Sequence, residues 1–504
     1  MEKKKVYLLL GLILLLALFL RIYHLNEKSL WMDEAFSVHH AGLEDIKSVS
    51  YNVGITEAAP MGYYILLHYW MKLFGDGVFA LRMLSVLFSF FSIGLLYLLV
   101  RLFFDVRVGL LASFLMAISM EQILFSQEVR MYSLFTFLTL LTVYIFFQGV
   151  LSLKDGKKNG KHFFLYVSLG ILLLAFYVNY LTFFLMGGLS FFLWWYLKVN
   201  RIKNRRKIIL EWLMGSVILL LLAIPVFEIA QAQFENLNVN LSNTLEGKGL
   251  PYFFAQFGLF FFALPIFLLV FLIFFLFIFR KRLWGVFFEK KYDWLFFFGL
   301  IGFGLVYLYL CFFPLRLFSI PLFRVPITNS YFLIRHSLFL APLLYVYAAY
   351  RIVFLRSFLR KISIIFLVLV SLVALAVYFE TQTKTEWEEA TRIVYENSEG
   401  KPLVLLDRAG ISNEFLWKYY YPGDFDFVRL TWGEGKRRVA KLSEDDLNDV
   451  LDGKDDFWVV FSKNEKTAAF YKNYFDTHYS LDMEKDFYQV KVYHYTLNGS
   501  ISFG

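Results

Sequence analysis

The chain is poor in the residues that build disulfides, metal sites and nucleotide sites. It has one cysteine, Cys311, in 504 residues, which excludes a disulfide within the chain. Its eight histidines show no metal-ligand spacing, so we expect no structural zinc site, and ligand spacing supports no divalent cofactor. No glycine-rich phosphate loop follows an expected strand, and no basic stripe is flanked by aromatic residues. Nucleotide and nucleic-acid binding are therefore not indicated.

Apolar residues are abundant instead. They make up 59% of the chain, which includes 61 phenylalanines, more than one soluble core can bury. The composition predicts a polytopic α-helical membrane protein, with a lipid bilayer as its surroundings. Eleven runs are long enough to cross about 30 Å of hydrocarbon. They lie near residues 6–24, 83–104, 107–124, 132–151, 162–180, 181–198, 208–227, 252–279, 293–313, 335–355 and 361–379.

The basic residues predict the orientation of these spans. The first run resembles a signal peptide, but no small-residue cleavage site follows it, so we interpret it as a retained anchor. Of the 34 Lys and Arg before residue 383, 24 lie in alternate connections, which the positive-inside rule places in the cytoplasm. The N-terminus is then cytoplasmic. These connections contain Lys3–Lys5, Arg101 and Arg107, Lys154–Lys161, Lys198–Lys207, Arg280–Lys291 and Arg351–Lys361.

This orientation requires that residues 60–76 do not span the bilayer. The segment is short, and His68, Trp70 and Lys72 suit a helix at the membrane interface. If this segment crossed the bilayer, every later loop would lie on the opposite side of the membrane. With the interfacial interpretation, the outer face receives the loop 25–82, three shorter loops and the C-terminal segment.

The chain changes character after Thr383. Residues 384–504 carry 16 Lys and Arg against 22 Asp and Glu, and charged periodic segments replace the apolar runs. We expect a membrane domain over 1–382 and an extracytoplasmic soluble domain over 383–504. Helices alternating with short apolar strands predict a small α/β layer fold for the second domain. The expected order is helix 387–397, strand 402–407, helix 413–421, strand 426–430, helix 444–451, strand 457–462, helix 466–478 and a strand pair near 487–497.

Two adjacent acidic residues, Asp33 and Glu34, lie shortly after the first span. Two carboxylates at a membrane surface are costly to keep there and suit an acid-base site, although they also fit the start of an interfacial helix. The basic residues expected outside the membrane are mostly arginines. Their planar fork of donors matches phosphate oxygens, while snorkelling at the interface is the alternative. For Glu128, the sequence favours a salt bridge with a nearby arginine.

Four segments carry a resemblance to a known family: SLWMDEA, APMGYYILL with LFGDGVFALRMLS, FSQEVRMYSL, and YFLIRH before Pro342. In these the chain resembles the family-39 glycosyltransferases of the GT-C fold. This group includes the dolichyl-phosphate-mannose protein mannosyltransferases and the bacterial aminoarabinose transferase of lipid A. The family often has His-Pro-Pro where this chain has Ala59-Pro60-Met61, which removes a candidate metal ligand or acceptor contact.

The resemblance implies transfer of a sugar from a polyprenyl-phosphate donor to an extracytoplasmic acceptor. Asp33 matches the position of the general base, and Glu34 would hold the acceptor or tune Asp33. The leaving phosphate needs cationic and hydrogen-bonding partners. The candidates are Arg82, Arg130, Tyr132, Arg335 and His336.

Three other functions remain open at this level. A polysaccharide polymerase or ligase would use arginines on a diphosphate-linked glycan. A transporter of lipid-linked sugars would show repeated halves and mid-membrane charges, which the chain lacks. A scaffold without catalytic activity would bind a partner through the C-terminal domain.

Overall fold

The computed structural model describes residues 2–153, 163–202, 204–233, 335, 338–381, 384–406, 411–432, 440–462 and 465–497. The chain divides into two compact units. One contains the helices up to Thr381 except residues 26–40. The other contains residues 26–40 together with the chain that follows Thr381.

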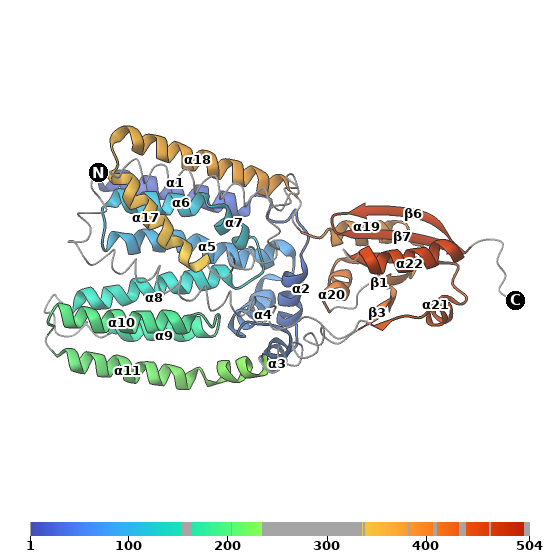
Figure 1. The fold of residues 1–504 in the computed structure, drawn as a ribbon, viewed down its shortest axis with the longest axis horizontal. Coiled ribbons are helices and arrows are strands. Elements are labelled where there is room, and N and C mark those ends of the chain that lie inside the picture. The colour runs from blue at the N-terminus through green and yellow to red at the C-terminus, as the bar shows by residue number, and fades with distance from the viewer. Residues whose placement is uncertain are drawn as a thin grey trace. The chain divides into compact units, whose positions relative to one another are not determined.

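The described residues before the C-terminal segment form helices of different lengths, and the long ones coincide with predicted apolar runs (Figure 1). The helices are α1 (Lys3–Ile22), α2 (Met32–Ala41), α3 (Ile46–Thr56), α4 (Gly62–Phe74), α5 (Val78–Arg101), α6 (Val106–Ile118), α7 (Met120–Ser126), α8 (Tyr132–Ser152), α9 (Phe163–Phe176), α10 (Thr182–Val199), α11 (Arg205–Leu222), the 3-10 helix η3 (Leu338–Leu340), α17 (Ala341–Phe354) and α18 (Ser357–Glu380).

Among the described residues, five helices are long and apolar enough to cross a membrane, or up to seven if each of two bent helix pairs counts as one span. Two further apolar helices are shorter, so nine of the eleven predicted runs coincide with helices. The runs at 252–279 and 293–313 lie outside the described residues. The prediction of a polytopic helical membrane protein is confirmed.

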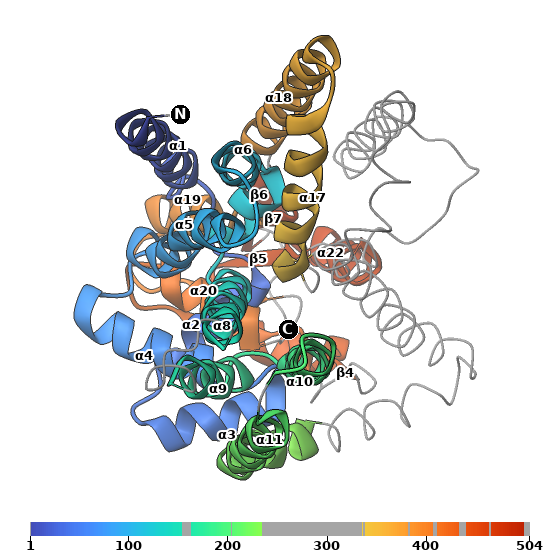
Figure 2. The same ribbon diagram turned by 90° about the vertical axis from the view of Figure 1, so that its left-hand side faces the viewer.

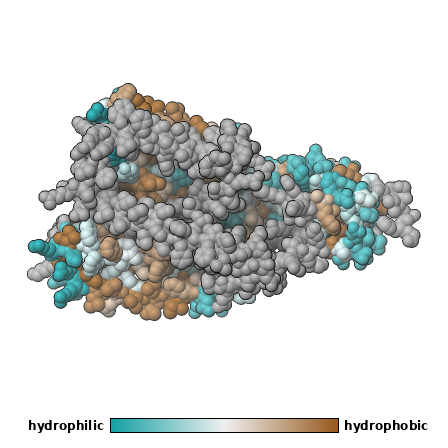
Figure 3. Space-filling model, in the orientation of Figure 1, coloured by the Kyte–Doolittle hydropathy of each residue, from teal (hydrophilic) through white to brown (hydrophobic). Residues whose placement is uncertain are grey.

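The helices of this unit pack side by side around a large apolar cluster, and smaller clusters lie between individual helices. Figure 2 looks nearly along several of them and shows α9 beside α8 and α11. The outward faces of α11 and α18 carry large exposed side chains such as Leu213, Val217, Ile365 and Leu369. Figure 3 shows these faces in brown. Apolar side chains on the outside of a bundle are what a surrounding bilayer requires.

α4 falls within the segment that the sequence assigns to the interface. Its 13 residues span about 20 Å, which is less than the hydrocarbon thickness. One face buries Tyr63, Tyr64 and Leu67, while Leu73 and Phe74 near the helix end are exposed.

The C-terminal segment forms a five-stranded sheet in the order β2-β1-β5-β7-β6, with β1 parallel to β2 and β5 and with β5, β7 and β6 antiparallel. A small α/β fold is thus confirmed. The elements are α19 (Trp387–Glu396), β1 (Leu403–Leu406), α20 (Ile411–Tyr420), β2 (Asp426–Arg429), β3 (Thr431–Trp432), β4 (Ala440–Lys441), α21 (Glu444–Leu451), β5 (Asp456–Ser462), α22 (Glu465–His478), β6 (Tyr479–Phe487) and β7 (Val490–Leu497).

Two details of this unit differ from the expectation. The strand pair begins earlier than residue 487, because β6 starts at Tyr479 directly after α22. This part of the strand is mostly exposed, but Tyr479, Leu481 and Met483 alternate with polar residues there, a strand signal that the expected order leaves out. The two-residue strands β3 and β4 form a separate small ladder that the pattern does not predict.

Candidate active site

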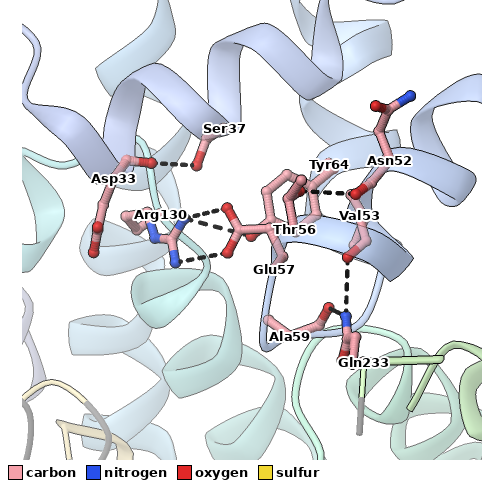
Figure 4. Close-up of polar contacts among 10 residues, drawn as sticks. All are labelled: Asp33, Ser37, Asn52, Val53, Thr56, Glu57, Ala59, Tyr64, Arg130 and Gln233. Carbon is pink, nitrogen blue, oxygen red and sulfur yellow. Dashed lines mark hydrogen bonds and ion pairs between the residues drawn. The ribbon is translucent and has the colours of Figure 1, made fainter. Parts of the chain in front are cut away.

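The adjacent carboxylates Asp33 and Glu34 lie in the first turn of α2, where the helix dipole favours negative charge. Asp33 is half-buried, and its backbone carbonyl accepts a hydrogen bond from Ser37 Oγ at 3.1 Å (Figure 4). Glu34 is fully buried and forms an ion pair with Lys384 Nζ at 2.8 Å. Two neighbouring acids therefore occupy different environments. Of the two, only Asp33 keeps part of its surface accessible.

Arg130, in the connection between α7 and α8, meets a carboxylate from the connection between α3 and α4. Its Nη1 lies 3.0 Å from Glu57 Oε1, and its Nη2 lies 3.3 Å from Glu57 Oε2 (Figure 4). Both side chains are less than 10% exposed. This fork-to-fork geometry is the one in which a guanidinium binds a carboxylate or a phosphate.

The Tyr64 hydroxyl completes this group. It accepts a hydrogen bond from Arg130 Nη1 at 3.4 Å. Burial raises the pKa of the Tyr64 hydroxyl well above its ordinary value; the neighbouring Arg130 opposes this rise and the Glu57 carboxylate adds to it. At neutral pH the hydroxyl is therefore protonated and remains a hydrogen-bond donor.

The chain around Glu57 is held by backbone contacts. Gln233 Nε2 donates to the carbonyls of Val53 and Ala59, at 3.1 and 2.9 Å (Figure 4). Gly62 N–H donates to the Tyr177 carbonyl at 2.6 Å, and a Cβ on Gly62 would lie 2.4 Å from that oxygen. Only glycine permits this approach. The backbone is thus held both before and after Glu57.

Glu57 is not among the residues predicted from the sequence. It is the only acidic residue between positions 46 and 75. It lies just before Pro60, in the segment where the family has its His-Pro-Pro pattern. The available signal was a single acid in a stretch of 30 residues whose other charged residues are Lys47 and Lys72.

Arg82, on the first turns of α5, is buried and donates from Nη1 to the Leu25 carbonyl at 2.7 Å. Gln127 Nε2 donates to the carbonyls of Arg21 and Tyr23, at 3.0 and 2.8 Å. Both side chains therefore bind the backbone that leaves α1. Ser85, one turn after Arg82, donates to the Arg130 carbonyl at 3.3 Å. The start of α5 and the Arg130 connection consequently pack together.

The remaining predicted residues have different surroundings. Tyr132 begins α8, is buried, and packs edge-on against Phe125 with ring centroids 5.3 Å apart. Arg335 is half-buried. His336 lies outside the described residues. Glu128 is buried, and its salt bridge with a nearby arginine stays a prediction.

No group of three or more His, Cys, Asp or Glu that could hold a metal ion occurs in the part of the chain that the structure describes. What the site does contain is a buried guanidinium in bidentate geometry. In a low-dielectric setting such a group binds an anion strongly. Its present partner is Glu57.

Comparisons with known proteins agree with the predicted resemblance. Residues 57–228 match the family described as "Dolichyl-phosphate-mannose-protein mannosyltransferase". The matched region begins at Glu57 and contains Arg82, Arg130 and Tyr132. No curated protein matches the sequence significantly.

Solved structures of two proteins, among others, share the fold. ArnT from Cupriavidus metallidurans, in its apo state and bound to undecaprenyl phosphate, aligns with a TM-score of 0.54 and 14% identity, over 96% of this chain and 97% of ArnT. The Archaeoglobus fulgidus oligosaccharyltransferase in its apo form aligns with a TM-score of 0.51 and 12% identity, over 99% of this chain and 75% of that protein. The chain thus has the GT-C glycosyltransferase fold and carries, over residues 57–228, the pattern of the dolichyl-phosphate-mannose-protein mannosyltransferase family.

Proposed function

We propose that this protein is a membrane glycosyltransferase that moves one sugar from a polyprenyl-phosphate carrier to an acceptor outside the cytoplasm. The observation that carries this proposal is the bidentate, buried geometry of Arg130 within the region that matches the family. The solved ArnT complex contains undecaprenyl phosphate, and an Archaeoglobus fulgidus complex contains dolichol-phosphate and an inhibitory peptide. Both lipid ligands are phosphates.

In the proposed reaction the acceptor hydroxyl attacks the anomeric carbon of the donor sugar. A bond forms between the acceptor oxygen and this carbon as the bond from the carbon to the phosphate oxygen breaks. Asp33 takes the proton of the acceptor hydroxyl. The electron pair of the broken bond goes to the lipid phosphate, which leaves with an added negative charge that arginines stabilise.

The proposal assigns binding of the donor phosphate to Arg130. Arg82 has a supporting role, because the start of α5 packs against the connection that contains Arg130. Tyr132 begins the helix that follows Arg130 and belongs to the same region. Arg335 and His336 are proposed as additional donors to the phosphate or sugar. Glu34 is assigned a supporting role beside Asp33.

The orientation follows the basic residues. We propose a cytoplasmic N-terminus and an extracytoplasmic C-terminal domain, which places Asp33 on the outer side of the membrane. The acceptor is a protein, a lipid or a cell-surface glycan on that side.

The test is turnover by the purified protein. Polyprenyl-phosphate hexoses and pentoses and polyprenyl-diphosphate glycans are each supplied with membrane extract as the source of acceptors. Released lipid phosphate and glycosylated products are measured by mass spectrometry. Release of polyprenyl phosphate from a monophosphate donor supports the proposal. Release of polyprenyl diphosphate alone would indicate a ligase instead, and movement of intact donor across vesicles without turnover would indicate a transporter.

A further inference from the structure

The Glu34 side chain is fully buried, and it forms an ion pair with a lysine from a distant part of the sequence. Lys384 Nζ lies 2.8 Å from Glu34 Oε2, and the Lys384 side chain is 7% exposed. The same oxygen accepts the backbone N–H of Trp31 at 3.3 Å. Burying two charges costs several kcal/mol per ion unless they are paired. This pair therefore fixes the first turn of α2 to the chain just before α19.

Other contacts tie the same segment to the C-terminal helices. Leu30 N–H donates to the Tyr420 hydroxyl of α20 at 2.6 Å. Ser29 Oγ lies 3.4 Å from the Glu388 backbone nitrogen, which donates to it. The rings of His39 and Phe415 form a T-shaped pair with centroids 5.5 Å apart. Residues 26–40 accordingly belong to the same compact unit as the C-terminal domain.

These contacts bear on Asp33, which precedes Glu34 in the same turn. A general base must stand within hydrogen-bond distance of the proton it removes, and a misplacement of about 1 Å costs roughly 100-fold in rate. The backbone on both sides of Asp33 is held by C-terminal residues, Lys384 through Glu34 and Tyr420 through Leu30. The position of the Asp33 backbone therefore depends on the C-terminal domain.

We propose that Lys384 is a positioning residue of the transferase: through Glu34 it fixes the turn that carries Asp33, and so makes the C-terminal domain part of the catalytic apparatus. This inference rests on the proposed function, because it takes Asp33 as the base. It also gives the two neighbouring acids different roles. Asp33 acts on the acceptor, whereas Glu34, fully buried at Lys384, supports the backbone.

The test compares Lys384→Met, Lys384→Arg and the matched control Lys401→Met. Lys401 is an exposed lysine of the same domain that pairs with Asp426 at 2.6 Å. Two quantities are measured: hydrogen exchange of peptides covering residues 26–40, and kcat together with the affinity for a polyprenyl phosphate. Exchange needs no turnover, so it reports on α2 even if the proposed reaction is wrong.

For Lys384→Met we expect faster exchange over residues 26–40 and a kcat lowered roughly 10- to 100-fold, with unchanged affinity for polyprenyl phosphate. Lys384→Arg keeps the charge and should recover most of the kcat, and Lys401→Met should behave as wild type. Normal exchange and normal kcat in Lys384→Met would overturn the inference. So would a loss of donor affinity that parallels the loss of kcat, since that pattern indicates general unfolding.

The double variant Glu34→Gln/Lys384→Met covers the case in which Lys384→Met does not fold. It removes both charges and leaves neither one buried alone, so it should be more stable than either single variant. Fast exchange over residues 26–40 with a low kcat upholds the inference, and wild-type values for both contradict it. If the wild-type protein transfers no sugar from any polyprenyl-phosphate donor, the proposed function fails, and the exchange data alone decide whether Lys384 holds α2.

Discussion

Arg130 and Glu57 form a buried, bidentate ion pair, with Nη1–Oε1 and Nη2–Oε2 distances of 3.0 and 3.3 Å. A carboxylate here takes the geometry that a phosphate would take on the same guanidinium. If a donor phosphate binds Arg130, it competes with Glu57 for the same N–H groups. Substitutions at Glu57 and at Arg130 should therefore change phosphate binding in opposite directions.

Glu57→Gln should lower the stability of the ligand-free protein, because it breaks the buried bidentate ion pair between Glu57 and Arg130. Removing one partner of a buried pair costs about 3 to 5 kcal/mol. A bound phosphate replaces the missing charge, so polyprenyl phosphate should raise the Tm of Glu57→Gln more than that of wild type. Thermal unfolding in detergent with and without this lipid measures both effects. The exposed Glu44→Gln is the control, and equal ligand-induced shifts in Glu57→Gln and wild type would show that the phosphate does not reach Arg130.

Arg130→Lys should weaken binding of polyprenyl phosphate by about 1.5 to 3 kcal/mol, because an ammonium keeps the charge but loses the two-pronged geometry. Arg82→Lys should weaken it too, and should also lower stability, since Arg82 binds the Leu25 carbonyl. Arg392→Lys, on the exposed face of α19, should have no effect. Titration of each variant in nanodiscs gives the affinities. If all three variants bound polyprenyl phosphate with the same affinity, Arg82 and Arg130 would have structural roles only.

Asp33→Asn should abolish transfer while the protein remains folded and binds its lipid donor. The change removes the base but little volume, and loss of a general base costs about 10²- to 10⁴-fold in rate. Turnover of a polyprenyl-phosphate sugar by purified protein is the measurement, and Glu44→Gln, which removes an exposed acid of the same predicted loop, is the control. A wild-type rate in Asp33→Asn would remove Asp33 from the mechanism.

Gly62→Ala should destabilise the connection that carries Glu57, because the new Cβ would lie 2.4 Å from the Tyr177 carbonyl oxygen. We expect a loss of about 1 to 3 kcal/mol, as for an overpacked core. Gly54→Ala, inside α3 with no heavy atom within 4 Å of its Cβ position, should instead be neutral or stabilising. Comparison of the two Tm values separates the close approach at Gly62 from a general effect of alanine.

The topology is tested with single cysteines introduced in a Cys311→Ser background. Cysteines replacing Lys47 and Lys454, both exposed, should react with a membrane-impermeant thiol reagent in cells whose outer barrier, if there is one, is opened. A cysteine replacing the exposed Arg206 should not react. The loop near residues 121–131 is a poor probe, because Gln127 is buried there. Labelling of Arg206→Cys but not of Lys454→Cys would invert the assigned orientation.

Most of the fold could be predicted from the sequence, because its signals are local. Apolar runs of about 20 residues identify spans wherever they occur, and nine of the eleven runs coincide with described helices. In the C-terminal domain α21 has the predicted bounds. Its Ser443–Asp446 capping box is a sequence signal in its own right. The start of β6 was missed although Tyr479, Leu481 and Met483 alternate with polar residues, because the strand follows α22 with no turn residue between them.

The site could be predicted only in part. The chemistry of Asp33, Arg82 and Arg130 was visible in residue type and in the family resemblance, and these assignments stay predictions. The sequence could not show that Glu57 faces Arg130, since the two are 73 positions apart. Nor could it show that Arg82 and Gln127 bind the backbone leaving α1.

The sequence by itself determined that this chain spans a membrane, that its last 120 or so residues form a charged α/β layer, and which residue types are available for phosphate and proton chemistry. Composition and periodicity suffice for this, because burial in lipid and in a small sheet acts on each segment separately. Only the tertiary structure decided which charges meet. Glu34 and Lys384 are 350 positions apart, and their pairing depends on how distant segments pack, since a buried charge is stable only beside an opposite one.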